Sequence, residues 1–160
     1  MKIIGVDIGG SKISTGLVSE GKIIRESTLA TPFDRPQYEV VQAVIQAIEE
    51  VFDPGINGIG IGVPGLVDLE EQTVLDVINI PSWNSVPLKE LISEYFNKPV
   101  EVNNDANCFA LGEKYYGKGK PYANFVGLTI GTGLGAGIII NNHLYSGRLC
   151  GAGEFGNIYY

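Results

Sequence analysis

Two glycine-rich turns in this chain combine residue types that suit the binding of phosphate. The first turn is the run Asp7-Ile8-Gly9-Gly10-Ser11-Lys12, and the second is Gly131-Thr132-Gly133. Glycine lets a backbone approach a ligand closely, and successive N–H groups of a turn can point at one anion. Two such turns that face each other could hold one polyphosphate between them. The predicted phosphate-binding residues are Gly9, Gly10, Ser11, Lys12, Gly131, Thr132 and Gly133.

The first turn also has a simpler interpretation. A tight hairpin with an aspartate as its cap would use the same residue types. Lys12 could equally be a solvated hairpin residue or a phosphate ligand. The presence of a second glycine turn of the same kind favours the phosphate hypothesis.

Two carboxylates follow predicted strands and are candidates for chemistry. Asp7 ends the first strand, where it is placed to hold Mg²⁺ through water, because Mg²⁺ takes few carboxylates and keeps several waters. Asp105 follows a strand predicted over residues 99–103, and the carboxyl ends of strands face the ligand cleft in α/β proteins. From the residues alone, both a general base and a plain helix cap are open interpretations of Asp105. Phosphoryl transfer tolerates a weak base, since it depends mostly on positioning.

Hydrophobic patterning predicts the elements that position these groups. Apolar residues at helical spacing, with Val44 and Ile48 among them, predict a helix over residues 38–52. Two further helices are expected over residues 87–96, capped by Ser85, and 106–116, while residues 65–86 give no clear pattern. The predicted strands are residues 3–8, 12–19, 22–29, 58–63, 99–103, 124–130 and 137–140.

The second glycine turn lies in a stretch that resembles the first. Aligning Gly5 with Gly127 pairs Ile8 with Ile130, and in both stretches the glycine turn separates two strands. The fold class is therefore α/β, with a mixed sheet in the order β-β-β-α-β-α-β-α over residues 1–116. Residues 117–160 are predicted to form the first hairpin of a second, related domain.

Composition limits the partners and the compartment of the protein. The net charge of −7 over 160 residues argues against nucleic acid or an anionic membrane surface as a main partner. No signal peptide and no apolar run of membrane-spanning length is present. Cys108 and Cys150 lack metal-like spacing and are typical of reduced thiols, so we expect a cytoplasmic protein.

Six motifs occur in the order seen in ROK sugar kinases, and the chain resembles that family over essentially its whole length. The motifs are Asp7-Ile8-Gly9-Gly10-Ser11-Lys12, Pro64-Gly65-Leu66-Val67-Asp68, Asn79-Ile80-Pro81-Ser82-Trp83, Asn104-Asp105-Ala106-Asn107, Gly131-Thr132-Gly133-Leu134-Gly135-Ala136-Gly137 and Gly151-Ala152-Gly153-Glu154-Phe155-Gly156. The resemblance implies an actin-like ATPase fold of two ribonuclease-H-like domains, with ATP and a sugar in the cleft between them.

The resemblance also implies roles for individual residues. Asp105 would deprotonate a hexose hydroxyl for attack on ATP in the presence of Mg²⁺, converting glucose to glucose 6-phosphate for glycolysis. From the local sequence rather than from the resemblance, Trp83 in its loop is expected to flank the cleft, and Cys108 on a helix face is expected to lie in the core. We expect a homodimer of the complete protein. The implied sugar-binding residues are Gly65, Val67, Asn79, Asn104, Asp105, Glu154 and Asn157.

Several alternatives stay open at this point. The substrate could be an N-acetylhexosamine, mannose or fructose, and the chain could be a sugar-binding remnant without catalysis. A sugar-responsive transcriptional regulator of the same family is disfavoured. Such regulators carry a helix-turn-helix ahead of the sugar-binding body, whereas here the first predicted strand begins within the first three residues.

Two departures from the family pattern affect metal binding and activity. Asn157 stands where the family commonly has a histidine that joins a downstream cysteine cluster in binding zinc, and neither is present in these 160 residues. We therefore expect no zinc. The later part of the second domain, which completes the adenosine pocket in the family, is also absent. The 160-residue chain alone is expected to be inactive.

Overall fold

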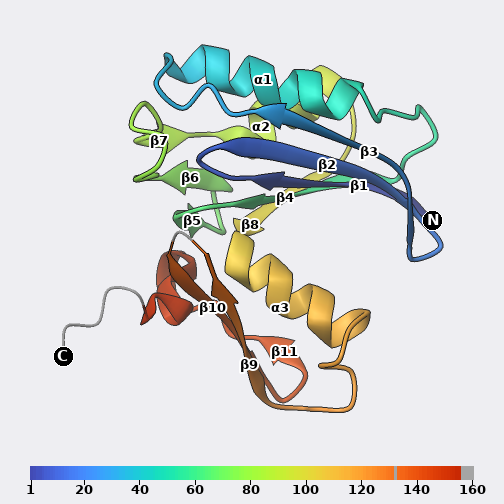
Figure 1. Ribbon diagram of the computed structural model, residues 1–160, viewed down its shortest axis with the longest axis vertical. Helices are drawn as coiled ribbons and strands as arrows, with labels where there is room; N and C mark the ends of the chain where they lie inside the picture. The colour runs from blue at the N-terminus through green and yellow to red at the C-terminus, as the bar shows by residue number, and fades with distance from the viewer. Residues whose placement is uncertain (132, 156–160) are drawn as a thin grey trace.

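The fold is built on a five-stranded mixed sheet in the order β3-β2-β1-β4-β8. The computed structural model describes residues 1–131 and 133–155 (Figure 1). Strand β2 runs antiparallel to β1 and β3, whereas β4 runs parallel to β1 and β8. The mixed sheet confirms the prediction. Its strands are β1 (Lys2–Ile8), β2 (Lys12–Ser19), β3 (Lys22–Ala30), β4 (Gly58–Val63) and β8 (Val100–Asn104).

Two helices, α1 (Gln37–Glu49) and α2 (Leu88–Phe96), cover one face of this sheet (Figure 1). The apolar stripe of α1 is buried against Ile4, Val6 and Ile8 of β1, as its helical spacing predicts. The predicted cap of α2 is wrong. Ser85 lies in a short strand, and α2 begins after Pro87 without a side-chain cap.

A small second sheet occupies the region for which no element was predicted. It consists of β5 (Leu66–Asp68), β6 (Thr73–Leu75) and β7 (Ser85–Val86), in that order. Strands of two or three residues are too short to show a period of two, so the pattern was not visible. Trp83 lies in the loop before β7 and is 0% exposed within the main core, so its predicted place at the cleft is wrong.

Helix α3 (Asp105–Tyr115) lies between the five-stranded sheet and a third sheet (Figure 1). The third sheet contains β9 (Phe125–Ile130), β10 (Leu134–Ile140) and β11 (His143–Leu144), and a 3-10 helix, η1 (Arg148–Gly153), follows it. A β-carbon on Gly62 of β4 would stand 3.5 Å from the Cα of Asp105, so α3 begins directly on β4. Its remaining length packs on β9 and β10.

The hairpins β2-β3 and β10-β11 have left-handed residues at both central positions of their turns. Asn141 and Asn142 have φ values of 52° and 68°, and Glu20 and Gly21 have φ values of 52° and 75°. Positive φ at both central residues is the geometry of a two-residue hairpin turn. Across residues 1–131 and 133–155, no helix combines the length and the apolar character needed to cross a membrane.

Candidate functional site

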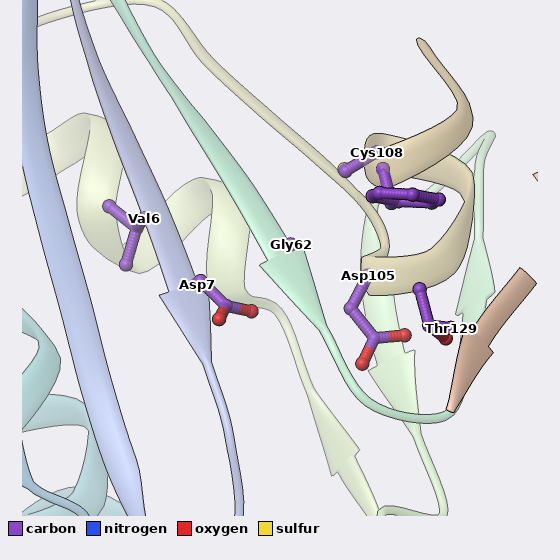
Figure 2. A pocket seen from close by; sticks show the side chains of 7 residues that line it. Val6, Asp7, Gly62, Asp105, Cys108 and Thr129 are labelled. Atoms are coloured by element: carbon purple, nitrogen blue, oxygen red, sulfur yellow. The ribbon is translucent and has the colours of Figure 1, made fainter. Parts of the chain in front are cut away.

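A cavity of about 420 Å³ opens between the ends of β1 and β4, the start of α3, and β9 (Figure 2). Both predicted carboxylates, Asp7 and Asp105, line it, and Figure 2 shows them pointing toward the same opening. The carboxyl ends of the parallel strands β1, β4 and β8 meet here, which is where α/β sheets bind ligands. The full lining is Val6, Asp7, Gly62, Asp105, Cys108, Phe109 and Thr129.

Asp105 is held at this place by its neighbour Asn104. The Oδ1 atom of Asn104 accepts hydrogen bonds from the backbone N–H groups of Ala106 at 3.0 Å and Asn107 at 3.2 Å, so Asn104 is the N-cap of α3. Asp105 also accepts from the N–H of Ala106, at 2.7 Å, and its side chain remains exposed toward the cavity. Because Asn104 supplies the cap, the carboxylate of Asp105 is left for another role.

The surroundings of Asp105 make it a stronger base than an ordinary aspartate. Loss of hydration raises the pKa of Asp105, and the negative charge of Asp7 raises it further, while the hydrogen bond from Ala106 opposes both effects. A base with a raised pKa holds a proton more firmly once it has accepted it.

Cys108 lies one turn further along α3 and lines the cavity, so its predicted place in the core is wrong. Burial, together with the charges of Asp105 and Asp7, raises the pKa of the Cys108 thiol to about 11. A thiol that stays protonated at neutral pH is a poor nucleophile.

The glycines of the first turn follow Asp7 by two residues, and hydrogen bonds hold the turn in place. The N–H of Gly9 donates to the carbonyl of Lys12 at 2.8 Å, closing the turn. The buried Thr31 donates its hydroxyl to the carbonyl of Gly9 at 2.7 Å and its N–H to the carbonyl of Ser11 at 3.1 Å. Ser11 and Lys12 are exposed.

The second glycine turn has the same relation to the cavity as the first. Thr129 lines the cavity two residues before Gly131, just as Asp7 does two residues before Gly9. The N–H of Gly131 donates to the carbonyl of Gly133 at 3.0 Å, and no described atom lies within 4 Å of a β-carbon placed on either glycine. Thr132 lies outside the described residues. Thr129 was not predicted, although the alignment of Gly5 with Gly127 pairs it with Asp7.

The predicted sugar contacts divide into exposed and structural groups. Asn79 is exposed and lies against the first turn, since a β-carbon on Gly10 would stand 2.8 Å from its Cβ. Asn104 is buried, and its Nδ2 donates to the carbonyl of Gly65 at 3.1 Å. Val67 is fully buried, backbone included, and pairs with Val74 of β6, so the structure leaves it no surface for the predicted sugar contact.

Glu154, another predicted sugar contact, follows η1 and is half-buried. Asn157 lies outside the described residues.

A buried polar network that was not predicted joins η1 to α3. Asn103 Oδ1 accepts from Asn107 Nδ2 at 3.0 Å and from Cys150 Sγ at 3.3 Å. The sequence did not predict this network, because Cys150 lies 47 residues from Asn103 and reaches it only in the folded chain.

The carboxylates fit a magnesium ion that arrives with a nucleotide. Mg²⁺ in nucleotide sites takes one or two carboxylates and fills its other positions with water and phosphate, which Asp7 and Asp105 permit. Within the described ranges, no group of three or more His, Cys, Asp or Glu side chains is placed to hold a metal ion by protein ligands alone.

Comparisons with known proteins agree with this geometry. The sequence profile described as "ROK family" matches residues 3–160. A glucokinase from Thermotoga maritima is 39% identical over 160 residues, covering 99% of this chain and 50% of the relative. A crystal structure of a ROK family glucokinase from Streptomyces griseus, in complex with glucose and AMPPNP, superimposes with a TM-score of 0.90 at 41% identity. It covers 99% of this chain and 50% of that one.

Relatives with other functions match almost as well. A xylose repressor from Caldicellulosiruptor bescii is 38% identical over 97% of this chain and 40% of its own length. An N-acetyl-D-glucosamine kinase from Yersinia pestis is 37% identical over 96% of this chain and 60% of its own. The chain spans about half the length of the glucokinases that it matches.

Proposed function

Because the chain belongs to the ROK family, with the actin-like ATPase fold, we propose that it supplies the catalytic carboxylate of an ATP-dependent hexose kinase. We propose glucose as the substrate, since the glucokinases of T. maritima and Streptomyces coelicolor are 39% and 43% identical to this chain. One observation above all supports catalysis: Asp105 lies in a cavity with Asp7, and its pKa is raised.

In the proposed reaction, Asp105 accepts the proton of the primary hydroxyl of the sugar. The hydroxyl oxygen forms a bond to the γ-phosphorus of ATP, and the bond from that phosphorus to the bridging oxygen of ADP breaks. The products are the sugar 6-phosphate and ADP. Positioning and charge stabilisation provide most of the rate in such a transfer, so the base must be well placed rather than strong.

The other residues are assigned by their place around Asp105. The turns at residues 9–12 and 131–133 hold the phosphates through backbone N–H groups other than those of Gly9 and Gly131, which close the turns, with Thr132 and Lys12 as side-chain contacts. Asp7 holds Mg²⁺ through water, and the ion when bound would offset phosphate charge. Asn79, Glu154 and Asn157 bind sugar hydroxyls, together with the backbone of Gly65. Asn104 positions Gly65 and Asp105 and lies next to the sugar.

The remaining functional expectations concern the whole protein. We propose that it uses ATP and a sugar rather than nucleic acid, that it acts in the cytoplasm in glycolysis, and that it forms a homodimer. The similarity to a xylose repressor and to an N-acetyl-D-glucosamine kinase supports two alternatives, a sugar-responsive regulator and an N-acetylhexosamine kinase. The position of Asp105 in one cavity with Asp7 favours a kinase over a regulator, because a regulator needs no base.

Coupled measurement of ADP release by the full-length protein tests this function over glucose, mannose, fructose, N-acetylglucosamine and N-acetylmannosamine. We expect kcat/KM to be highest for glucose. A higher kcat/KM for an N-acetylhexosamine would replace glucose as the proposed substrate. The absence of ATP-dependent turnover with every hexose would overturn the proposal that the protein is a kinase. The 160-residue chain alone is expected to show negligible turnover.

A further inference from the structure

The 3-10 helix η1 lies where β5, β10 and the start of α3 meet. A β-carbon on Gly151 would stand 3.8 Å from the side chain of Leu66 in β5. A β-carbon on Gly153 would overlap the carbonyl oxygen of Ala136 in β10, so the two backbones are in direct contact. Toward α3, η1 makes its contact through the thiol of Cys150.

The backbone of η1 is strained at two neighbouring residues. Leu149 and Cys150 have φ values of 52° and 60°, in the left-handed region that favours glycine. A residue with a side chain stays in this region only where the surrounding contacts stabilise it. A glycine would adopt the same conformation freely, so the backbone alone gives no reason for a cysteine at position 150.

The thiol of Cys150 is buried beside the first turn of α3. Its Sγ donates to Asn103 Oδ1 at 3.3 Å, and the same oxygen accepts from Asn107 Nδ2 at 3.0 Å and from the N–H of Asn104 at 2.9 Å. Cys150 is 2% exposed, and burial raises the pKa of its thiol, so the thiol keeps its proton at neutral pH. One amide oxygen thus joins η1 to the residue that caps the helix of Asp105.

The other end of η1 leads directly to Glu154, a predicted sugar contact. The N–H of Glu154 donates to the carbonyl of Gly151 at 3.4 Å, which ties its backbone to the residue after Cys150. The N–H of Ala152 donates to the carbonyl of Ser146 at 3.0 Å and closes the same turn. The thiol of Cys150 therefore links the segment that bears Glu154 to the segment that begins α3.

We propose that Cys150 is a positioning residue for sugar binding: its thiol holds Glu154 at a fixed place relative to Asp105. The inference rests on the proposed function, in which Glu154 binds a sugar hydroxyl and Asp105 accepts a proton from the sugar. Cys150 acts through Glu154 and is itself buried away from the ligand. Without the thiol hydrogen bond, Glu154 would shift relative to Asp105, and a binding group displaced in this way holds the sugar less tightly.

The variants Cys150→Ala and Cys150→Ser test the proposal in the full-length protein. Alanine removes the donor, whereas serine keeps a hydroxyl that can donate to Asn103. For Cys150→Ala we expect the KM for glucose and the calorimetric Kd for glucose to rise about tenfold. The KM for ATP and kcat should stay within about threefold, because Asn104 still caps α3. For Cys150→Ser all of these constants should stay within about threefold.

Leu149→Ala is the matched control, because it truncates the neighbouring side chain of η1 and leaves the thiol in place. Its KM for glucose should stay within about threefold of the unaltered enzyme. A thiol that served only packing would lower the melting temperature of Cys150→Ala and leave the KM for glucose unchanged, which would overturn the proposal. An equal rise in KM for Cys150→Ser and Cys150→Ala would also contradict it, since serine keeps the donor.

Hydrogen exchange separates this inference from the proposed function. The absence of turnover with every hexose in the unaltered protein would be a failure of the kinase proposal alone. The link between Cys150 and Glu154 is measured without sugar, by the exchange of the backbone N–H groups of Ala152 and Glu154. We expect exchange at least about tenfold faster in Cys150→Ala, and within about threefold of the unaltered protein in Cys150→Ser. Equal exchange rates in Cys150→Ala and the unaltered protein would overturn the inference.

Discussion

Asn79 lies directly against Gly10, so that a β-carbon on Gly10 would stand 2.8 Å from the Cβ and 3.4 Å from the Cγ of Asn79. Gly10 belongs to the turn predicted to hold phosphate, and Asn79 is a predicted sugar contact. The fold therefore brings together residues that the proposed reaction needs side by side. Only a glycine at position 10 leaves room for this approach.

Substitution Gly10→Ala should move the loop that carries Asn79. The Cβ of Asn79 is fixed to the backbone, so the contact cannot be relieved by rotating the side chain. We expect the free energy of unfolding to fall by about 1–3 kcal/mol, and glucose binding by the full-length protein to weaken. Urea unfolding and calorimetric titration measure these effects. Gly112→Ala, where the β-carbon meets no described atom, should instead stabilise by about 0.5–1 kcal/mol. Equal stability of Gly10→Ala and the unaltered chain would refute the contact.

Removal of the Asn104 side chain should destabilise the chain, because this one side chain makes several buried hydrogen bonds. Asn104→Ala deletes the cap of α3 and the hydrogen bond to Gly65, and leaves buried partners unsatisfied. The expected loss is about 1–3 kcal/mol in the free energy of unfolding. Asn84→Ala, at an exposed loop position, should change stability by no more than about 0.5 kcal/mol. A similarly small change for Asn104→Ala would contradict its structural role.

The raised pKa of Asp105 predicts an unusual stability profile. A carboxyl whose pKa is higher in the folded than in the unfolded chain favours its neutral form on folding. Its contribution to stability is therefore complete below the ordinary pKa of 3.8 and is lost as the pH rises through the raised value. Asp105→Asn removes this loss, so the variant should unfold at a higher temperature than the unaltered chain at pH 7. The difference should disappear near pH 3, and a variant less stable at pH 7 would contradict the prediction.

The charge of Asp7 is one cause of that raised pKa, which a second measurement can isolate. Carboxyl-carbon NMR titration should show a lower pKa for Asp105 in Asp7→Asn than in the unaltered chain. Asp53, whose pKa is lowered mainly by its hydrogen bond to Lys2, serves as an internal reference and should not change. An unchanged Asp105 pKa would show that the two carboxylates do not interact.

The sequence predicted the helices and strands whose apolar residues recur at a regular spacing. The apolar stripe of α1, the strand that bears Asp7 and the strand that precedes Asp105 follow directly from residue spacing, and the glycine turns follow from residue type. Trp83 and Cys108 were misplaced, because a single residue has no period and its burial depends on distant strands. The packing of α3 on β9 and β10 was not foreseen either. It depends on Gly127 and Gly137, whose register is fixed only when the strands pair.

Elemental analysis of the full-length protein, purified without added metal, tests the expected absence of zinc. Structural zinc requires four Cys or His ligands, and an amide at position 157 is a poor replacement for imidazole. We predict much less than one zinc per chain. About one zinc per chain would contradict the prediction and would require ligands beyond Cys108 and Cys150.

Turnover of the Asp105→Asn variant is the most direct test of the proposed chemistry. In the full-length protein we expect kcat with glucose and ATP to fall by about 10²–10⁴-fold or more, because the variant cannot accept the hydroxyl proton. Glucose should still bind, since Asn keeps the size of the side chain. Asp34→Asn, an exposed loop carboxylate, should leave kcat unchanged. A kcat for Asp105→Asn within about threefold of the unaltered enzyme would show that Asp105 is not the base.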